Sequence, residues 1–329
     1  MGDTMEKKRI LSGMRPSGRL HLGNYAGALE NWLKLQNEYD CYFFVADWHA
    51  LTTNPAAAFS VEENTVQMII DWLSAGIKPD LPLFVQSKVK EHAELHLIFS
   101  MLITKERLER NPTLKEQIRD LHAETIIYGH LGYPVLQAAD ILMYKAHLVP
   151  VGEDQLPHVE ITREIARKFN QTYAEVFPEP EPKLTTFSRL PGLDGHKMGK
   201  SNNNFILISD PPEEIQKKVR MAVTDPQKIR KNDPGHPGIC NVFKYHQKFN
   251  PEEVDQIEKD CESGVLGCVA CKQNCANKIA DFFAPLREKR QYYEQHMDEV
   301  WDVLNEGTKK AKAVAEKTMD DVHKAMKMG

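Results

Sequence analysis

The residues RILSGMRPSGRLHLGN at positions 9–24 decide the fold class, because they join a strand candidate to a tight turn and then to a helix. Arg9–Gly13 is predicted to form the strand, and the proline and glycine that follow predict the turn. From Leu22 onward, apolar residues recur at helical spacing. The free amide groups at the start of such a helix suit a phosphate. An ordinary turn that carries a surface histidine, His21, explains the pattern equally well.

The same alternation of strand and helix continues along the chain. Apolar segments at residues 41–46, 83–87 and 148–152 are strand candidates, and helices are expected over about 60–76, opened by a capping box, and over about 154–169. Alternating strands and helices predict a parallel sheet with helices on both faces, which is an α/β fold of the Rossmann-like kind. Ligands in such sheets bind at the carboxyl ends of the strands.

Two domains are predicted from the change in pattern. Strand signals vanish from about Pro211, and helical patterns follow, including one over 304–326. The sequence therefore predicts a Rossmann-like domain at residues 1–205, with a helical insertion at about 58–140. It predicts an all-helical C-terminal domain at residues 206–329.

Composition and charge exclude several classes of protein. The formal net charge of -5 argues against bulk coating of nucleic acid, so no DNA partner is expected. No apolar run approaches the roughly 20 residues that span a bilayer, so no membrane partner is expected either. The amino-terminal residues lack the apolar core of a signal peptide. We therefore expect a cytoplasmic protein.

A second motif, KMGKS at positions 197–201, follows the flexible run Gly192–Gly195. Two lysines on a mobile loop can close over a pyrophosphate and neutralise charge that develops in a transition state. By itself the pentapeptide is more typical of a basic surface loop.

The two motifs together resemble the His-Ile-Gly-His and Lys-Met-Ser-Lys-Ser signatures of class I aminoacyl-tRNA synthetases. Between them, DWHALT (47–52), YPVLQAADIL (133–142) and VPVGEDQ (149–155) resemble segments of the bacterial tryptophanyl-tRNA synthetase family, and the likeness covers nearly the whole chain. This resemblance implies activation of L-tryptophan by ATP with Mg2+, and transfer of the amino acid to tRNA(Trp). It also implies a homodimer and an anticodon-recognising C-terminal domain.

The resemblance also implies roles for individual residues. The residues expected to act in catalysis are His21, Asn24, Lys197, Lys200 and Ser201. Those expected to bind ATP are Arg15, Ser17, Gly23, Gly152 and Asp154. Asp140 would accept the indole N–H of tryptophan, and the rest of that site would be Tyr133, Gln137, Gln155, His49, Val149 and Val151.

Physical chemistry supports the role of Asp140 independently. A buried carboxylate is costly unless it is paired. Phenylalanine would fill an aromatic pocket but leave this group unmatched, and sites of this kind reject such analogues by roughly 10⁴–10⁵. A surface acid on a helix is the alternative interpretation of Asp140.

Three departures from the family pattern leave alternatives open. Gly199 stands where the second signature usually has serine, and Asn24 replaces the last histidine of the first. Gln137 also occurs in tyrosyl enzymes, so a tyrosyl-tRNA synthetase is one alternative. The others are a non-charging paralogue that acts as a metal-cluster sensor or regulator, and a small-molecule nucleotidylyltransferase.

Five of the six cysteines fall within one C-terminal segment, which suggests metal binding in a cytosolic chain. The candidate ligands are Cys240, Cys261, Cys268 and Cys271, with Cys275 as a spare. Four thiols fit zinc or a [4Fe–4S] cluster, and their spacing does not decide between the two. The segment resembles that of tryptophanyl enzymes that carry a [4Fe–4S] cluster, which favours iron–sulfur over zinc or free thiols.

Overall fold

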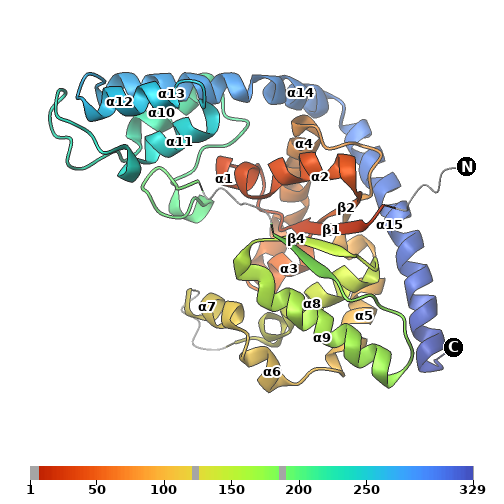
Figure 1. Cartoon of the computed structure of the whole chain (residues 1–329). Coiled ribbons are helices and arrows are strands. Elements are labelled where there is room, and N and C mark those ends of the chain that lie inside the picture. Colours follow the sequence, from red (N-terminus) through yellow and green to blue (C-terminus); the bar gives the residue numbers. More distant parts are fainter. Residues whose placement is uncertain (1–6, 121–125, 185–189, 329) are drawn as a thin grey trace, which may run out of the picture.

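The computed structural model describes residues 7–120, 126–184 and 190–328. Its centre is a parallel sheet with the strand order β3-β2-β1-β4-β5 (Figure 1). The strands are β1 (Arg9–Met14), β2 (Asp40–Val45), β3 (Leu83–Val85), β4 (Leu148–Val151) and β5 (Glu181–Leu184). The predicted α/β class with a parallel, Rossmann-like sheet is therefore confirmed.

Helices cover both faces of this sheet, and the alternation within β2 shows why. Cys41, Phe43 and Val45 belong to one apolar core, while Tyr42 and Phe44 belong to the core on the opposite face. Successive side chains of a strand point to opposite faces, so a strand that is apolar at every position is buried on both.

The helices of the first part of the chain begin with a continuous helical segment after the first turn. It comprises α1 (Leu22–Asn24), a π-helical stretch (Tyr25–Leu29) and α2 (Glu30–Glu38). The others are α3 (Asp47–Leu51), α4 (Val61–Ala75), α5 (Glu91–Ser100), α6 (Lys105–Glu109), α7 (Pro112–Asp120), α8 (Tyr128–Met143) and α9 (Leu156–Thr172).

The capping box predicted at the start of α4 is wrong. Ser60 is the N-cap residue, but its side chain makes no bond to the helix backbone. Its hydroxyl instead donates to the carbonyl of Ala57 at 3.3 Å and accepts from the Asn64 amide at 3.2 Å. The 3₁₀ turn Pro55–Phe59 directly before the helix offers this competing acceptor.

The range 58–140, predicted as a helical insertion, contains α4 and also the edge strand β3. The helices between β3 and α8, which are α5, α6 and α7, lie below the sheet in Figure 1. They place α8 against α5 and α9.

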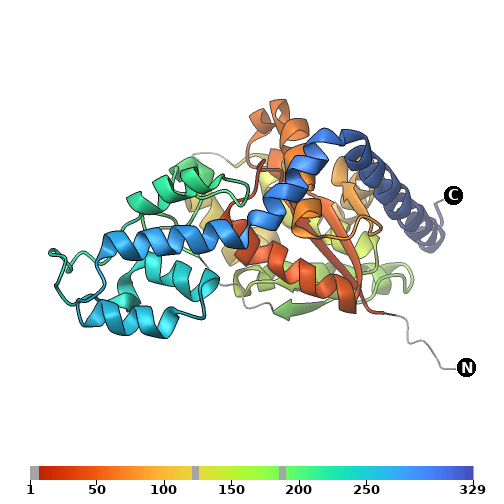
Figure 2. The same cartoon turned by 90° about the horizontal axis from the view of Figure 1, so that it is seen from above.

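The C-terminal part is helical in its described residues. It contains α10 (Pro212–Met221), α11 (Asn241–Phe249), α12 (Val254–Glu262), α13 (Cys268–Phe282), α14 (Ala284–Gln295) and α15 (Met297–Met326). Helices α10–α13 gather at one end of the molecule, and α14 leads back to α15 at the other end (Figures 1 and 2). Helix α15 packs on β3 at Gly307, where a Cβ atom would overlap the Leu83 carbonyl oxygen.

Among the described residues, no helix is long and apolar enough to cross a membrane.

Candidate functional site

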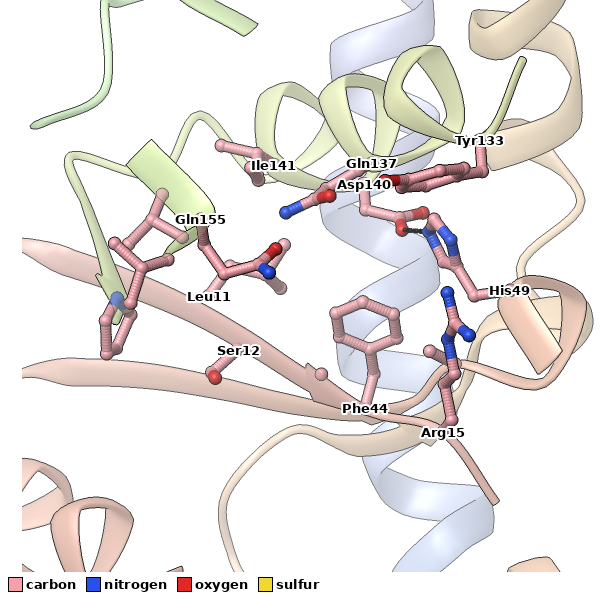
Figure 3. A pocket seen from close by; sticks show the side chains of 15 residues that line it. Leu11, Ser12, Arg15, Phe44, His49, Tyr133, Gln137, Asp140, Ile141 and Gln155 are labelled. Atoms are coloured by element: carbon pink, nitrogen blue, oxygen red, sulfur yellow. Dashed lines mark hydrogen bonds and ion pairs between the residues drawn. The ribbon is translucent and has the colours of Figure 1, made fainter. Parts of the chain in front are cut away.

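A cavity of about 350 Å³ opens at the carboxyl ends of β1 and β4. The strand order reverses between these two neighbours, which is where open α/β sheets bind ligands. Its volume lies at the lower end of the roughly 300–1,000 Å³ typical of small-molecule sites. The cavity is lined by all seven residues predicted to bind tryptophan, namely His49, Tyr133, Gln137, Asp140, Val149, Val151 and Gln155 (Figure 3).

Asp140 lies at the wall of this cavity on α8 and is almost completely buried. Its Oδ2 atom accepts from His49 Nε2 at 2.8 Å, and its Oδ1 atom accepts from His92 Nδ1 at 2.6 Å. Burial raises the pKa of Asp140, but the hydrogen bonds from His49 and His92 outweigh this effect, so the pKa is lowered to about 2. A buried, charged acceptor therefore faces the cavity.

Sequence reasoning missed two of the groups that hold this carboxylate, Gln86 and His92. The amide of Gln86 donates to both oxygens of Asp140, at 2.7 and 2.9 Å. His92 is fully buried and also contacts the Tyr144 hydroxyl through Nε2 at 2.7 Å. Gln86 directly follows β3, so the rule that ligands bind at strand ends could have identified it.

These bonds engage both carboxylate oxygens twice, which is about the capacity of the group. The N–H group of a bound ligand must therefore share an acceptor position on Asp140 with one of these donors, or displace that donor. Of the three donors, His49 lines the cavity, whereas Gln86 and His92 are fully buried and do not belong to its lining. His49 is thus the partner that a bound ligand can displace.

Tyr133 faces the same cavity, and its hydroxyl lies 2.8 Å from His158 Nε2. The amide oxygen of Asn111 accepts from the Thr113 N–H, which directs the amide nitrogen to His158 Nδ1 at 2.9 Å. Nδ1 is therefore an acceptor, and Nε2 donates to Tyr133. Burial, with His49 acting in the same direction, lowers the pKa of His158 to about 4, so the ring is neutral. This arrangement orients the tyrosine hydroxyl.

The two signature segments meet beside this cavity. Lys200 Nζ donates to the carbonyl of Ser17, and the N–H of Gly23 lies 3.3 Å from the Met198 sulfur. Burial, followed by the positive charge of Lys200, lowers the pKa of His21 to about 4. The chain thus brings a neutral histidine and a lysine together from motifs far apart in sequence.

His21 and Asn24 cap the helix reciprocally. The backbone N–H of Asn24 donates to His21 Nδ1 at 3.2 Å, and the Asn24 side-chain oxygen accepts from the His21 N–H at 3.1 Å. Nδ1 is used as an acceptor, so Nε2 carries the proton of the neutral ring and is the atom that can donate to a phosphate.

The remaining predicted residues lie at the end of β1, on the Lys200 loop and after β4. Arg15 lines the cavity and points into it from the end of β1 (Figure 3), and burial lowers its pKa. Lys197 and Ser201 are exposed on the loop that carries Lys200. Gly152 and Asp154 follow β4 but are not part of the cavity lining.

Two glycines of the signatures should respond differently to substitution. Gly18 has φ +81°, and an added Cβ would lie 2.7 Å from Asn64 Oδ1 and 3.1 Å from Lys200 Nζ. Gly199 is extended, with φ -170°, and a Cβ there would meet its nearest neighbour, Ser201 Oγ, at 3.8 Å. We expect Gly18→Ala to cost about 1 kcal/mol or more of stability and to lower turnover. Gly199→Ser should leave stability and turnover at their wild-type values within experimental error. Thermal unfolding and steady-state kinetics of the two variants can check this.

The four candidate metal ligands come from separate elements. Cys240 precedes α11, Cys261 lies in α12, and Cys268 and Cys271 lie in the first turn of α13. Burial, and then the charges of the other three thiols, raise the pKa of Cys271 to about 12. The four groups thus lie within electrostatic range of one another. In the part of the chain that the structure describes, however, no three His, Cys, Asp or Glu side chains are arranged to hold a metal ion.

Comparisons with known proteins agree with the geometry. The family described as "tRNA synthetases class I (W and Y)" matches residues 4–284. The chain is 44% identical to the tryptophan–tRNA ligase of Aquifex aeolicus, over 97% of this chain and 100% of that protein. It is 49% identical to the tryptophan–tRNA ligase of Thermotoga maritima, over 97% and 99%. The tryptophanyl-tRNA synthetase of Campylobacter jejuni, solved with ADP and tryptophan, superposes with a TM-score of 0.87 at 32% identity, over 97% and 99%.

Proposed function

We infer the reaction from one premise: the chain belongs to the class I tRNA synthetases of the tryptophan and tyrosine (W and Y) type. It is a tryptophan–tRNA ligase. It activates L-tryptophan with ATP to give tryptophanyl-adenylate and pyrophosphate, and then transfers tryptophan to the 3′ end of tRNA(Trp). The observation that carries this conclusion is the buried, ionised Asp140 in a cavity next to the junction of the two signatures.

We propose the following roles in the first step. The indole ring enters the cavity between Val149 and Val151, and its N–H donates to Asp140 in place of His49. Tyr133, Gln137 and Gln155 hold the ammonium group, and Arg15 lies where the amino acid meets the phosphates. This arrangement positions the tryptophan carboxylate for attack on the α-phosphorus.

The ATP side of the reaction is proposed to depend on the two signatures. His21 Nε2 and Asn24 donate to phosphate oxygens, with Ser17 and Gly23 in the same turn. Lys197, Lys200 and Ser201 hold the leaving pyrophosphate, while Gly152 and Asp154 bind the ribose. Mg2+ enters with ATP and offsets part of the phosphate charge.

Tryptophan-dependent exchange of pyrophosphate into ATP tests this function. We expect exchange with tryptophan and far less with tyrosine, followed by charging of tRNA(Trp). A regulatory paralogue would show no exchange, a small-molecule nucleotidylyltransferase would show no dependence on tryptophan, and a tyrosyl enzyme would prefer tyrosine.

We further propose that Cys240, Cys261, Cys268 and Cys271 hold a [4Fe–4S] cluster. All four candidate ligands are thiols, which suits an iron–sulfur cluster or zinc. The other three thiols influence the pKa of Cys271, so the four lie close enough together to support a common site. Gly235 leaves space beside this set, because a Cβ there would lie 2.5 Å from Cys261 Sγ. Such a cluster would be structural, since adenylate formation requires no electron transfer.

Metal analysis of anaerobically purified protein tests the cluster. We expect a brown protein with broad absorption near 400 nm and about four irons per chain. Cys268→Ser should abolish the colour, whereas Cys41→Ser, at a buried cysteine of β2, should not change it. A colourless protein with one zinc per chain would refute the assignment.

We propose that residues 1–205 carry catalysis, with the insertion at about 58–140, and that residues 206–329 recognise the anticodon. We also propose a homodimer. The packed helices α5 and α8 expose Leu97, Met101 and Tyr128, which would suit an apolar interface. Light scattering on the purified protein would distinguish a dimer from a monomer.

A further inference from the structure

Arg290 on α14 and Asp71 on α4 form an ion pair that is almost completely removed from solvent. Arg290 is 3% exposed and Asp71 is 0% exposed. The Arg290 guanidinium donates through Nη1 to Asp71 Oδ1 and through Nη2 to the Gln67 side-chain oxygen. Buried pairs of this kind contribute little net stability, because desolvation offsets their attraction.

The second oxygen of Asp71 has a different partner. Asp71 Oδ2 accepts from the backbone N–H of Leu20 at 2.6 Å. Leu20 directly precedes His21, the first polar residue of the helix start. The same segment also bonds to the chain that follows KMGKS. The carbonyl of Leu20 accepts from the Ile208 N–H at 3.0 Å, and the Leu22 N–H donates to the carbonyl of Ile206 at 2.9 Å.

The charge of Asp71 also reaches the second signature. Burial lowers the pKa of Lys200, and the carboxylate of Asp71 opposes this effect. One buried carboxylate therefore bonds to the backbone beside His21 and stabilises the charged form of Lys200.

We propose that Arg290 and Asp71 are a positioning pair for the ATP signatures. Arg290 orients the Asp71 carboxylate, which holds the Leu20 backbone and thereby sets the place of His21 relative to Lys200. Arg290 comes from α14, the helix that leads from the α10–α13 group to α15 (Figures 1 and 2), so the pair ties this connection to the ATP site. The inference rests on the proposed function.

An apolar replacement separates positioning from simple stabilisation. Arg290→Met alone leaves a buried, unpaired carboxylate and should lower the melting temperature. In the double variant Asp71→Leu with Arg290→Met, apolar side chains fill the space without a buried charge, so stability should return toward wild type. The Leu20 N–H still lacks its charged acceptor in this double variant.

The test compares thermal unfolding with tryptophan-dependent pyrophosphate exchange in these variants. We expect the double variant to regain stability while kcat/KM for ATP stays roughly 10- to 100-fold below wild type, which corresponds to loss of a charge-assisted hydrogen bond. KM for tryptophan should stay within about twofold, because Asp71 lies outside the cavity lining. Recovery of kcat/KM for ATP together with stability would overturn the proposal.

Two further variants and one binding measurement serve as controls. Arg287→Met, on the same helix, removes a guanidinium whose Nη2 donates to Ala280 and should leave the ATP kinetics unchanged. If the double variant does not fold, Asp71→Asn replaces it, because it keeps the volume and an oxygen acceptor but loses the charge. Its kcat/KM for ATP should then lie below the wild-type value. ATP affinity measured by calorimetry tests the pair even if wild-type protein shows no exchange, a result that would count against the proposed function. Equal ATP affinity in wild type, Asp71→Asn and Arg290→Met would then overturn the pair's role.

Discussion

Asp140→Ala is expected to raise KM for tryptophan and to erode selectivity against phenylalanine by about 2–4 kcal/mol. The expected loss has two sources. The indole N–H loses a charged acceptor, and the donors Gln86, His49 and His92 lose the group that they share. Phenylalanine never used that acceptor, so its activation should fall less than that of tryptophan.

The measurement is the ratio of kcat/KM for tryptophan and phenylalanine in pyrophosphate exchange. Asp47→Asn is the matched control, because Asp47 is also a buried acid and accepts from the N–H groups of Trp48 and Ser87 at 3.0 Å. It should affect stability but leave the ratio unchanged. An unchanged ratio in Asp140→Ala would show that the indole ring binds elsewhere.

The pKa of Asp140 gives this prediction a pH dependence. The folded value of about 2 lies below the ordinary value of 3.8, so the carboxylate stabilises the fold above the ordinary pKa. That contribution is lost as the pH falls toward 2. Selectivity that depends on Asp140 should therefore be constant between about pH 5 and 8.

Lys200→Ala is expected to lower kcat for adenylate formation by about 10²–10³, with a smaller change in KM for ATP. In the free protein, the Lys200 ammonium group bonds to the carbonyl of Ser17 within the first signature. During the reaction, the Lys200 ammonium group is expected to contact the pyrophosphate instead. This contact is strongest in the transition state, because the leaving group gains negative charge there. Its loss should therefore affect the transition state more than ATP binding.

Pre-steady-state formation of the adenylate, measured over a range of ATP concentrations, separates the two parameters. Lys34→Ala is a suitable control, since Lys34 lies on α2 and pairs with Glu30 on the exposed surface. It should behave as wild type. A change in Lys200→Ala that is confined to KM for ATP would contradict a role in the transition state.

The strands that could be predicted from the sequence are those with continuous apolar runs. Residues 41–46 and 149–152 are buried in the sheet, and such burial leaves a clear pattern. β5 was missed because Glu181-Pro182-Lys183-Leu184 is polar and contains proline. It pairs only with β4 at the edge of the sheet, where such a sequence is tolerated.

The candidate site was predictable where its residues lie in recognisable motifs. All seven residues expected to bind tryptophan line one cavity, although their individual roles stay predictions. The position of Gln86 after β3 could have indicated a place in the site, but its bonds to Asp140 and those of His92 could not be predicted, because they join residues 54 and 48 positions apart in sequence. The Asp71–Arg290 pair joins residues 219 positions apart, so only the fold reveals it.

The central claim is that one ATP molecule is held jointly by the His21 turn and the Lys200 loop, with the indole ring on Asp140. A crystal structure with ATP and the unreactive analogue tryptophanamide tests it most directly. We predict the triphosphate between His21 and Lys200, and the indole nitrogen within hydrogen-bonding distance of an Asp140 oxygen. A triphosphate that contacts only one of the two signatures, or an indole ring outside the cavity, would contradict the account.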